Sequence, residues 1–584
     1  MNCPPLSSAR LRNGLLLILF FIVGRAVFLE YTNLVDPTES RYATVAQEML
    51  LSGNWLTPTL PSSEGRIPYL GKPPLHFWLT ALSYKIFGFD EWTSRFPSLV
   101  FAILILGLVF VHGRRYFGEE AGLIAALIAA SSWMLYFLAG ASVTDVTLTA
   151  LISGGVVTLY RFVADSNCPT RFCYFAAVFG ALAFLVKGPV AIVLIGLPFF
   201  LWSLIRKDFA WMRRLHWVRM GILFFAIVTP WFVLSEIQNP GFIEYFIWNE
   251  NIARYLFKEY GDKYGSGHRH FYGMAWLMLL AGFAPWSLML IGAVIRIGFK
   301  KSWQWVSSDS HRLFTLCWAL SAAVFFTFVR QLHMLYIFPC VPGLSVLMAA
   351  MCVTEPVRAA VSSAIEKINR PLMLLAVLMW AVAMLIGTQL EYSALTFILP
   401  IAIFAAVALV ACKTRDFASA SGAVGFVSLL IVSVYIVSIA CLTPFVNRRH
   451  SAEEMLEYVA DEMPGHEPVE RVGVFSNSSY SHYWTSKAWE SELSRRVIVK
   501  YVSEDDLRRD RIKLLIIKDR KQPPAEDIMK SFEFVMQKGE WELYRRKRTE
   551  SDAGESKAIS RRQSDAHTPV RFGANAKTDR RHAA

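Results

Sequence analysis

Thirteen apolar runs, most of them long enough to cross a lipid bilayer, constrain the fold of this chain more than any other feature. A spanning helix needs about 20 mostly apolar residues, and 54% of the 584 residues are hydrophobic. The two short runs that flank Lys187-Gly188-Pro189 predict either two spans or one re-entrant hairpin. The sequence therefore predicts an α-helical polytopic membrane protein of about thirteen transmembrane helices, at 14–30, 96–112, 121–139, 145–164, 173–186, 189–204, 217–236, 273–296, 312–329, 333–352, 371–388, 394–411 and 422–442.

Basic residues gather in alternate short loops between these runs, which predicts the orientation of the chain. The pattern places the N-terminus in the cytoplasm and the loop 31–73 outside, and with thirteen spans the segment after 443 is also outside. The first run has no small-residue cleavage site, so we expect an uncleaved helix. The net charge of +13 is then explained by cytoplasmic anchors and a basic tail, and no nucleic-acid partner is needed.

The composition changes after residue 443. Ser451-Ala-Glu-Glu predicts a capped helix to about Met463. Five short β-rich runs follow, and strands interleaved with helices indicate a small α/β domain. We therefore expect a membrane domain at 1–442, a soluble α/β domain at 443–547 and a disordered basic tail at 548–584. The predicted strands are Arg471–Phe475, Arg496–Val502, Lys513–Lys518, Phe532–Gln537 and Trp541–Tyr544.

Candidate chemistry lies in the outward loops, where ionisable groups gather at one face of the membrane. In the segment 31–95, an apolar stripe from Tyr42 to Leu50 has helical spacing and predicts a helix along the membrane surface. The stretch Pro74–Phe87 is too short to span and is expected to be interfacial. The second long outward loop is 237–271. The polar residues of interest in these and the shorter loops are Asp36, Glu39, Arg41, Lys72, Asp145, Lys187, Glu250, Arg254, His268, Arg269, His270, Arg330 and His333.

Several motifs in series resemble those of a bacterial membrane glycosyltransferase family, the protein O-mannosyltransferases and the lipid A aminoarabinose transferases. The similarity covers about residues 14–350. It rests on Glu39-Ser-Arg41-Tyr42-Ala, Tyr69-Leu-Gly-Lys72-Pro-Pro-Leu-His-Phe-Trp78, Glu91-Trp-Thr-Ser-Arg95-Phe-Pro97, Lys187-Gly-Pro189, Trp248-Asn-Glu250-Asn251-Ile-Ala-Arg254-Tyr255 and Gln331-Leu-His333-Met-Leu-Tyr336-Ile-Phe-Pro339.

This resemblance implies a GT-C fold in the bacterial inner membrane. It also implies an undecaprenyl-phosphate (polyprenyl-phosphate) sugar donor and an acceptor outside the cytoplasmic membrane, either lipid A or another envelope glycan, with a protein acceptor less favoured. Membrane lipids are further partners. In such a reaction a lipid phosphate leaves the anomeric carbon, so cations favour its departure, while the acceptor hydroxyl needs a base.

By resemblance, the catalytic base is Glu39 or Asp36, with Glu39 preferred for its place in the motif. The residues expected to bind the donor phosphate or the substrates are Arg41, Tyr42, Lys72, Asp145, Lys187, Glu250, Arg254, Arg269, Arg330, His333 and Tyr336.

The chain departs from the family at three positions. Thr38 stands where the family has the aspartate of its acidic pair. Gly71 and Asn251 stand where the aminoarabinose enzymes have a Glu and a His that bind zinc. We therefore predict no metal at that site, no certain cofactor, and a sugar other than aminoarabinose; a divalent metal elsewhere stays open.

Two other functions fit the composition. A lipid-linked sugar flippase or transporter needs many helices and a basic cavity, but it typically has two related halves with charges near the midplane. A non-catalytic membrane sensor is consistent with the departures at Thr38, Gly71 and Asn251.

Overall fold

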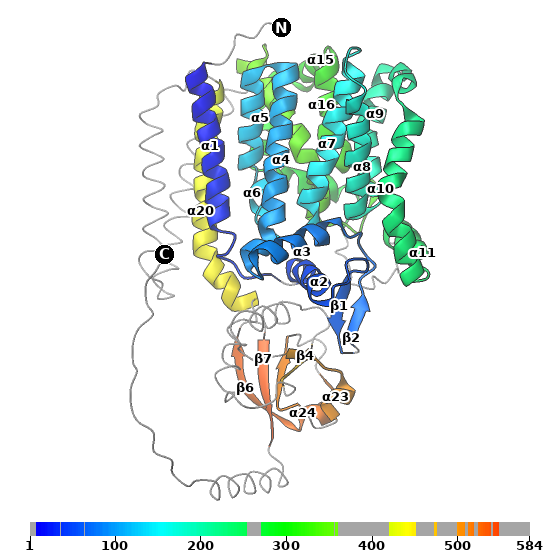
Figure 1. Ribbon diagram of the computed structural model, residues 1–584. Helices are drawn as coiled ribbons and strands as arrows, with labels where there is room; N and C mark the ends of the chain where they lie inside the picture. Colours follow the sequence, from blue (N-terminus) through cyan, green and yellow to red (C-terminus); the bar gives the residue numbers. More distant parts are fainter. Residues whose placement is uncertain are drawn as a thin grey trace, which may run out of the picture.

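The computed structural model comprises a bundle of helices and a smaller mixed sheet beyond one end of it (Figure 1). Several segments carry no structural description here. The residues that the structure describes are 7–35, 37–63, 65–253, 270–355, 357–359, 420–450, 472–475, 499–508, 512–518, 524–538 and 541–547.

The bundle forms because most of its helices are apolar over a length close to the bilayer thickness. Eleven of the thirteen predicted runs lie in the described residues, and each is helical over most of its length. Their helices are α1 (Ser8–Val27), α4 (Glu91–Phe117), α5 (Glu119–Ser131), α6 (Trp133–Leu138), α7 (Thr144–Ala164), α8 (Arg171–Lys187), α9 (Val190–Arg206), α10 (Trp217–Gln238), α13 (Met274–Gly282), α14 (Trp286–Ile297), α16 (Ser310–Phe325), α17 (Cys340–Val353) and α20 (Ala420–His450).

Fewer helices satisfy a strict test for spanning. Within the described residues, five are long and apolar enough to cross a membrane, and α13 with α14 adds a sixth if this pair, bent by 107°, is one broken span. The runs 371–388 and 394–411 lie outside the described residues, so the predicted total of thirteen stays a prediction. Helices α8 and α9 are 17 residues each, about 26 Å at 1.5 Å per residue, and stand as two rods in the bundle (Figure 1), which favours two spans over a hairpin.

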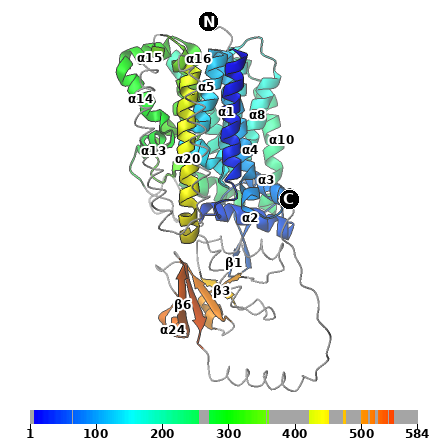
Figure 2. The same cartoon turned by 90° about the vertical axis from the view of Figure 1, so that its left-hand side faces the viewer.

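Two further helices, α2 (Thr38–Ser52) and α3 (Leu75–Phe87), lie across the end of the bundle (Figures 1 and 2). The predicted stripe of α2 is buried, with Val45, Ala46 and Met49 fully covered. The polar face of α2 is buried too, because the hairpin of β1 (Thr59–Ser62) and β2 (Gly65–Pro68) and the start of α4 cover it. The expectation of a surface helix was therefore too simple: α2 is an internal layer.

A buried arginine fastens the first helix to the bundle. Arg25 of α1 is 7% exposed. Its guanidinium donates hydrogen bonds to the carbonyl oxygens of Tyr136 (3.0 Å), Phe137 (3.3 Å) and Gly140 (2.8 Å). These carbonyls lie in and just after the last turn of α6, where helices leave carbonyls without intrahelical donors; that of Phe137 also accepts from the N–H of Gly140 at 3.2 Å. Arg25 thus caps α6 from another helix, and Gly140 leaves the space, since a Cβ there would lie 1.8 Å from the guanidinium.

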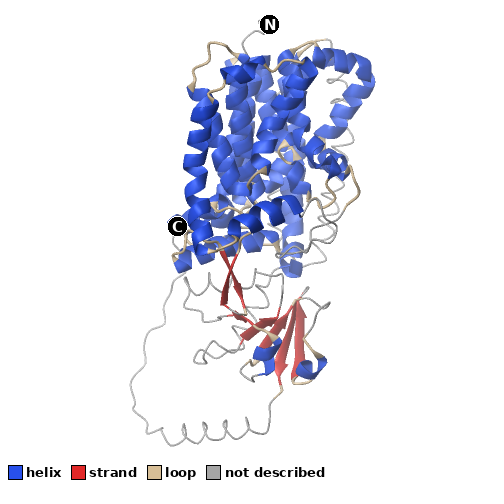
Figure 3. Ribbon diagram, turned by 90° about the vertical axis from the view of Figure 1, so that its right-hand side faces the viewer, coloured by secondary structure: helices blue, strands red, loops and turns tan. Residues whose placement is uncertain are grey.

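The C-terminal region contains all five predicted strands: β3 (Val472–Phe475), β4 (Val499–Tyr501), β5 (Leu514–Ile517), β6 (Phe532–Lys538) and β7 (Trp541–Arg546). They form one sheet in the order β4-β3-β5-β7-β6. β3 is parallel to β4 and β5, whereas β7 is antiparallel to β5 and β6. Figure 3 shows this sheet beyond the end of the bundle that carries α2 and α3. The short helices α23 (Glu504–Arg508) and α24 (Glu526–Met529) accompany the sheet. The predicted helix 451–463 and the tail 548–584 lie outside the described residues.

Replacing Arg25 with Leu should lower the thermal midpoint of the detergent-solubilised protein, because the carbonyls at the end of α6 would lose their donors. Hydrogen bonds to a charged group contribute about 1.5–3 kcal/mol each, so we expect a loss of at least that size. Thermal-shift size-exclusion chromatography measures it. Arg12→Leu, at an exposed position of the same helix, is the control, and equal midpoints for the two variants would contradict the capping role.

Candidate functional site

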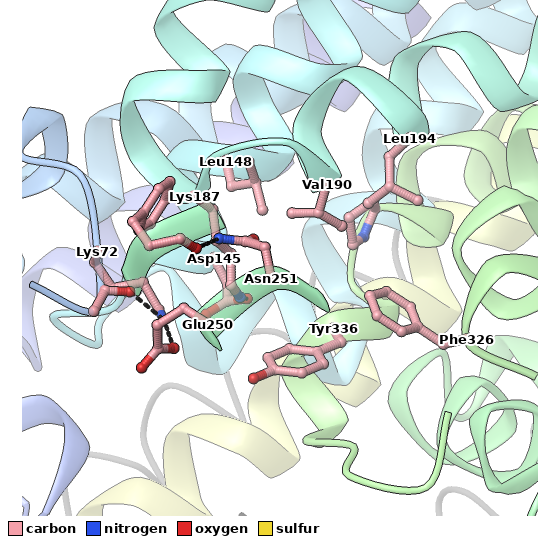
Figure 4. A pocket seen from close by; sticks show the side chains of 13 residues that line it. Lys72, Asp145, Leu148, Lys187, Val190, Leu194, Glu250, Asn251, Phe326 and Tyr336 are labelled. Atoms are coloured by element: carbon pink, nitrogen blue, oxygen red, sulfur yellow. Dashed lines mark hydrogen bonds and ion pairs between the residues drawn. The ribbon is translucent and has the colours of Figure 1, made fainter. Parts of the chain in front are cut away.

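A cleft lies at the end of the bundle where α2 and α3 lie, and loops from distant parts of the chain line it (Figure 4). It encloses about 470 Å³, counting the space that opens to solvent. One side is apolar and the other carries two lysines and two carboxylates. The lining residues are Gly71, Lys72, Asp145, Leu148, Lys187, Val190, Leu194, Phe246, Glu250, Asn251, Phe326, Tyr336 and Pro339.

Lys187 and Asp145 form the tighter of the two ion pairs in this cleft. Lys187 Nζ is 2.6 Å from Asp145 Oδ1 and 4.3 Å from the centre of the Tyr336 ring. Asp145 lies in the first turn of α7 and Lys187 is the last residue of α8. Both charges match the dipoles of their helices, which favour an anion at the start and a cation at the end. The sequence prediction of Asp145, Lys187 and Tyr336 as neighbours of one site agrees with this geometry.

Gly188 ends α8 and lets a second segment approach Lys187. Its φ is +74°, a conformation that glycine adopts without strain. A Cβ at this position would lie 2.6 Å from the Phe246 ring. Phe246 belongs to η2 (Tyr245–Ala253), which also carries Glu250. The Lys-Gly break in the sequence therefore does more than separate two helices, since it brings η2 to the cleft.

The second pair, Lys72 with Glu250, is looser. Lys72 Nζ is 3.6 Å from Glu250 Oε2 and donates a hydrogen bond to the carbonyl of Gly71 at 2.7 Å. Glu250 also accepts a hydrogen bond of 2.9 Å from the Tyr245 hydroxyl. An ammonium carries three N–H donors. Lys72, opposite Glu250, can therefore give donors to a phosphate oxygen more readily than Lys187, whose carboxylate lies a full ångström closer.

Glu39 is placed differently from the other predicted site residues, because it does not line the cleft. It is 8% exposed and accepts four hydrogen bonds. Arg95 supplies two of them, from Nε at 2.8 Å and Nη2 at 3.1 Å. The backbone N–H groups of Val35 (3.1 Å) and Ser142 (2.9 Å) supply the others. Both carboxylate oxygens are thus occupied, and Glu39 ties the loop before α2 to α4 and to the loop before α7.

The electrostatics of Glu39 disfavour proton uptake. Burial alone would raise its pKa, but the charge and hydrogen bonds of Arg95 and the N–H groups of Ser142 and Val35 hold the pKa below its usual value. A general base works best when its pKa is near the operating pH. The sequence offered Glu39 as the preferred base, and its surroundings favour a structural role instead.

Arg95, the partner of Glu39, was quoted in a sequence motif but not chosen as a site residue. Its Nη1 also donates to the carbonyls of Leu29 and Thr32, and Nη2 donates to Asn33. The sequence feature that could have identified Arg95 is its place in the second turn of α4, immediately before an apolar run. A charge at such a position requires buried partners.

Arg41 and Tyr42 lie beside the hairpin loop rather than on the cleft. Tyr42 is buried and packs edge-on against Phe77, with ring centres 5.6 Å apart. The Arg41 guanidinium carbon is 5.7 Å from the Tyr42 ring and 5.8 Å from the Tyr69 ring. The predicted role of both residues in substrate binding stays a prediction.

The predicted residues near 330 differ in their surroundings, although the His333 and Tyr336 rings are neighbours with centres 6.3 Å apart. Arg330 is exposed and stands 5.4 Å from the Tyr272 ring. His333 is also exposed, and its Nδ1 accepts the N–H of Leu335, which caps η4 (Met334–Ile337). Of the three residues predicted from this segment, Tyr336 lines the cleft. Asp36, Arg254 and Arg269 lie outside the described residues.

The residues at the zinc positions implied by the family resemblance do not fit a metal. Gly71 has no side chain, and its carbonyl accepts from Lys72. Asn251 Nδ2 donates to the carbonyl of Phe246 at 2.7 Å. Zinc prefers thiolate, imidazole and carboxylate ligands, and among the described residues no three such side chains come together. In the described part of the chain, the one side chain at this position that suits zinc is the carboxylate of Glu250, and it already faces Lys72.

Comparison with known proteins finds a family model that matches part of the chain and solved structures with a similar fold. Residues 71–233 match the family model described as dolichyl-phosphate-mannose-protein mannosyltransferase. The crystal structure of ArnT from Cupriavidus metallidurans bound to undecaprenyl phosphate superposes with a TM-score of 0.68 and 20% identity, covering 91% of this chain and 97% of that one. Its apo state gives 0.68 and 19%. At this level of identity the likeness shows that the chain has the same fold as these structures.

The chain is also similar in sequence to a group of bacterial transferases. An undecaprenyl phosphate-alpha-4-amino-4-deoxy-L-arabinose arabinosyl transferase of Proteus mirabilis is 26% identical over 340 residues, which is 58% of each chain. The enzyme of the same name from Shewanella sediminis is 28% identical over 353 residues, 59% of this chain and 60% of its own. The chain thus matches about three fifths of the length of these curated relatives.

Glu39→Gln should destabilise the protein more than it alters any one catalytic step, because it leaves the buried Arg95 charge without its counterion. Breaking a buried ion pair costs about 3–5 kcal/mol. The measurement is the thermal midpoint in detergent, with Glu30→Gln, at an exposed position, as the control.

The same pair predicts a pH dependence. The pKa of Glu39 is lower in the folded state than in the unfolded chain. Its stabilisation is therefore complete above the unfolded pKa of about 4.3 and is lost as the pH falls through the folded value. The difference in midpoint between wild type and Glu39→Gln should be constant from pH 6 to 8 and shrink below about pH 4. A difference that instead disappears near pH 6 would contradict this assignment.

Proposed function

We propose that this protein transfers a sugar from a polyprenyl-phosphate donor to an envelope acceptor, lipid A or another glycan, at the outer face of the bacterial inner membrane. The observation that carries the proposal is the cleft in which Lys72 and Lys187 face apolar side chains at one end of the helical bundle. Such a site suits a phosphate joined to a lipid. The GT-C fold and the names of the relatives, which specify undecaprenyl phosphate, support it.

The proposed reaction needs little covalent help from the protein. The acceptor oxygen attacks the anomeric carbon, the bond from that carbon to the phosphate oxygen breaks, and the polyprenyl phosphate leaves with the bonding electrons. The acceptor proton passes to a base. Lys72 and Lys187 would neutralise the charge that grows on the leaving phosphate, where fixed cations in a partly dry site are most effective.

We assign Glu39 to scaffolding in this proposal, and Asp36, the second sequence candidate, to the base. The support is the full set of donors around Glu39. Asp36→Asn should then abolish turnover with the thermal midpoint unchanged, whereas Glu39→Gln lowers the midpoint. Full activity of Asp36→Asn would contradict this assignment. The candidates for the base would then be Asp145 and Glu250, the carboxylates of the cleft.

We also propose that the reaction needs no metal at the positions of Gly71 and Asn251, because Lys72 already neutralises charge there. Chelation with EDTA should leave the transferase rate within twofold of the untreated rate. Elemental analysis of the purified protein should find less than about 0.1 zinc per chain. A stoichiometric zinc content, or loss of activity restored by zinc, would overturn this part.

Lys72→Met tests the proposal as a whole. Removing one group that stabilises transition-state charge typically costs about 10²–10³ in rate, so a deletion strain complemented with this variant should lose the modified glycoform. It should also accumulate the polyprenyl-phosphate-linked sugar. Mass spectrometry of envelope lipids measures both.

The matched control is Lys85→Met, which removes an exposed lysine of α3 and should behave as wild type. An envelope lipid profile that is identical with and without the wild-type gene would contradict the transferase proposal. Accumulation of the linked sugar on the cytoplasmic side alone would favour a flippase.

A further inference from the structure

His76 is fully buried at the start of α3, and its hydrogen bond joins α3 to α7 near the polar side of the cleft. Its Nδ1 lies 3.1 Å from the hydroxyl oxygen of Thr147 on α7. In the part of the chain that the structure describes, Nε2 has no hydrogen-bond partner. The ring meets Tyr42 edge-on, with centres 6.5 Å apart. A buried histidine with a single polar partner depends on that partner for its orientation.

The His76 ring is neutral under ordinary conditions. Burial lowers its pKa to about 4, although the nearby charge of Asp145 acts in the opposite direction. The bond to Thr147 therefore joins two neutral groups at pH 7 and stays unchanged between pH 6 and 8. Its strength does not depend on salt, unlike that of an exposed ion pair.

The two partners stand close in sequence to one member of each ion pair of the site. Lys72 precedes His76 by four residues, and the interval is Pro73, Pro74 and Leu75. Proline fixes φ, so this short segment transmits the position of α3 to Lys72 with little freedom. On the other side, Thr147 follows Asp145 by two residues in the first turns of α7, and Asp145 holds Lys187 at 2.6 Å.

We propose that His76 is a positioning residue for the donor phosphate: its hydrogen bond to Thr147 fixes the Lys72 loop at a set distance from the Asp145–Lys187 pair. This inference rests on the proposed function for the identity of the ligand. Elsewhere α3 packs on α2, α4 and α8, Trp78 Nε1 donates to the carbonyl of Trp55, and the Tyr84 hydroxyl shares a hydrogen bond with Ser94. The bond to Thr147 is therefore a direct link from α3 to α7. A displacement of one ångström in such a site costs up to about a hundredfold in rate.

Thr147→Val is the principal test, since valine keeps the shape of threonine and removes the hydroxyl. Thr149→Val is a closely matched control. Thr149 is also fully buried on α7, and among the described residues its hydroxyl has no hydrogen-bond partner. Thr147→Ser keeps the hydroxyl and should restore the wild-type behaviour.

The probe is undecaprenyl phosphate, titrated into the full-length protein in nanodiscs with the thermal midpoint as the signal. We expect Thr147→Val to raise the Kd about tenfold, with Thr149→Val and Thr147→Ser within twofold of wild type. A smaller folded fraction would reduce the amplitude without moving the Kd, so this readout separates positioning from stability. In a His76→Leu background, Thr147→Val should cause no further change.

Hydrogen exchange measured by mass spectrometry gives a second readout that needs no ligand. Thr147→Val should accelerate exchange in the peptide covering 68–76, and Thr149→Val should not. An unchanged Kd together with unchanged exchange in this peptide would overturn the positioning role. Failure of the wild-type protein to bind undecaprenyl phosphate would overturn the proposed function instead, and the exchange data would still decide whether the bond orders the loop.

Discussion

The ion pair of Glu39 and Arg95 is the interaction on which the architecture of the bundle end that carries α2 and α3 depends. Four donors surround one carboxylate, and Arg95 in turn holds three carbonyls of the loop that follows α1. Since a buried charge is tolerated only with such complete pairing, the loop, α2 and α4 take up one joint arrangement. The layer formed by α2 and α3, and with it the Lys72 loop, rests on this arrangement.

Two other cations, Arg25 and Lys187, are also paired by the protein, but the pairing has a different consequence for each. Arg25 is satisfied by carbonyls alone and so serves to join α1 to the end of α6. Lys187 is satisfied by Asp145, yet it stays at a cleft with Tyr336 against it. A cation closed off by the protein stabilises the fold, whereas a cation at the wall of a cleft remains available to a ligand. The separation of scaffold charges from site charges therefore follows from access rather than from residue type.

The distribution of charge along the membrane normal also bears on function. Within the described residues, Lys72, Asp145 and Lys187 sit near helix ends and Glu250 lies within η2, with apolar side chains of α7 and α9 on the other side of the cleft. A lipid phosphate could place its charge among the lysines and its chain against the apolar side. This arrangement suits chemistry at the membrane surface better than passage of a charged group through the midplane, for which buried charges at depth are typical.

Periodicity and composition determined much of the fold. Eleven apolar runs correspond to helices, and all five short β-rich runs to strands, because helical and strand spacing are local properties of the chain. The motifs also identified Lys72, Lys187, Glu250 and Tyr336, and the polar residues of the short loops added Asp145; the structure brings all five to one cleft. Only the tertiary structure decided that Glu39 is saturated by Arg95, that His333 caps a turn, and that His76 meets Thr147. Those outcomes depend on which side chains from distant segments reach one another, and burial then sets whether a charge is closed off or exposed to a ligand.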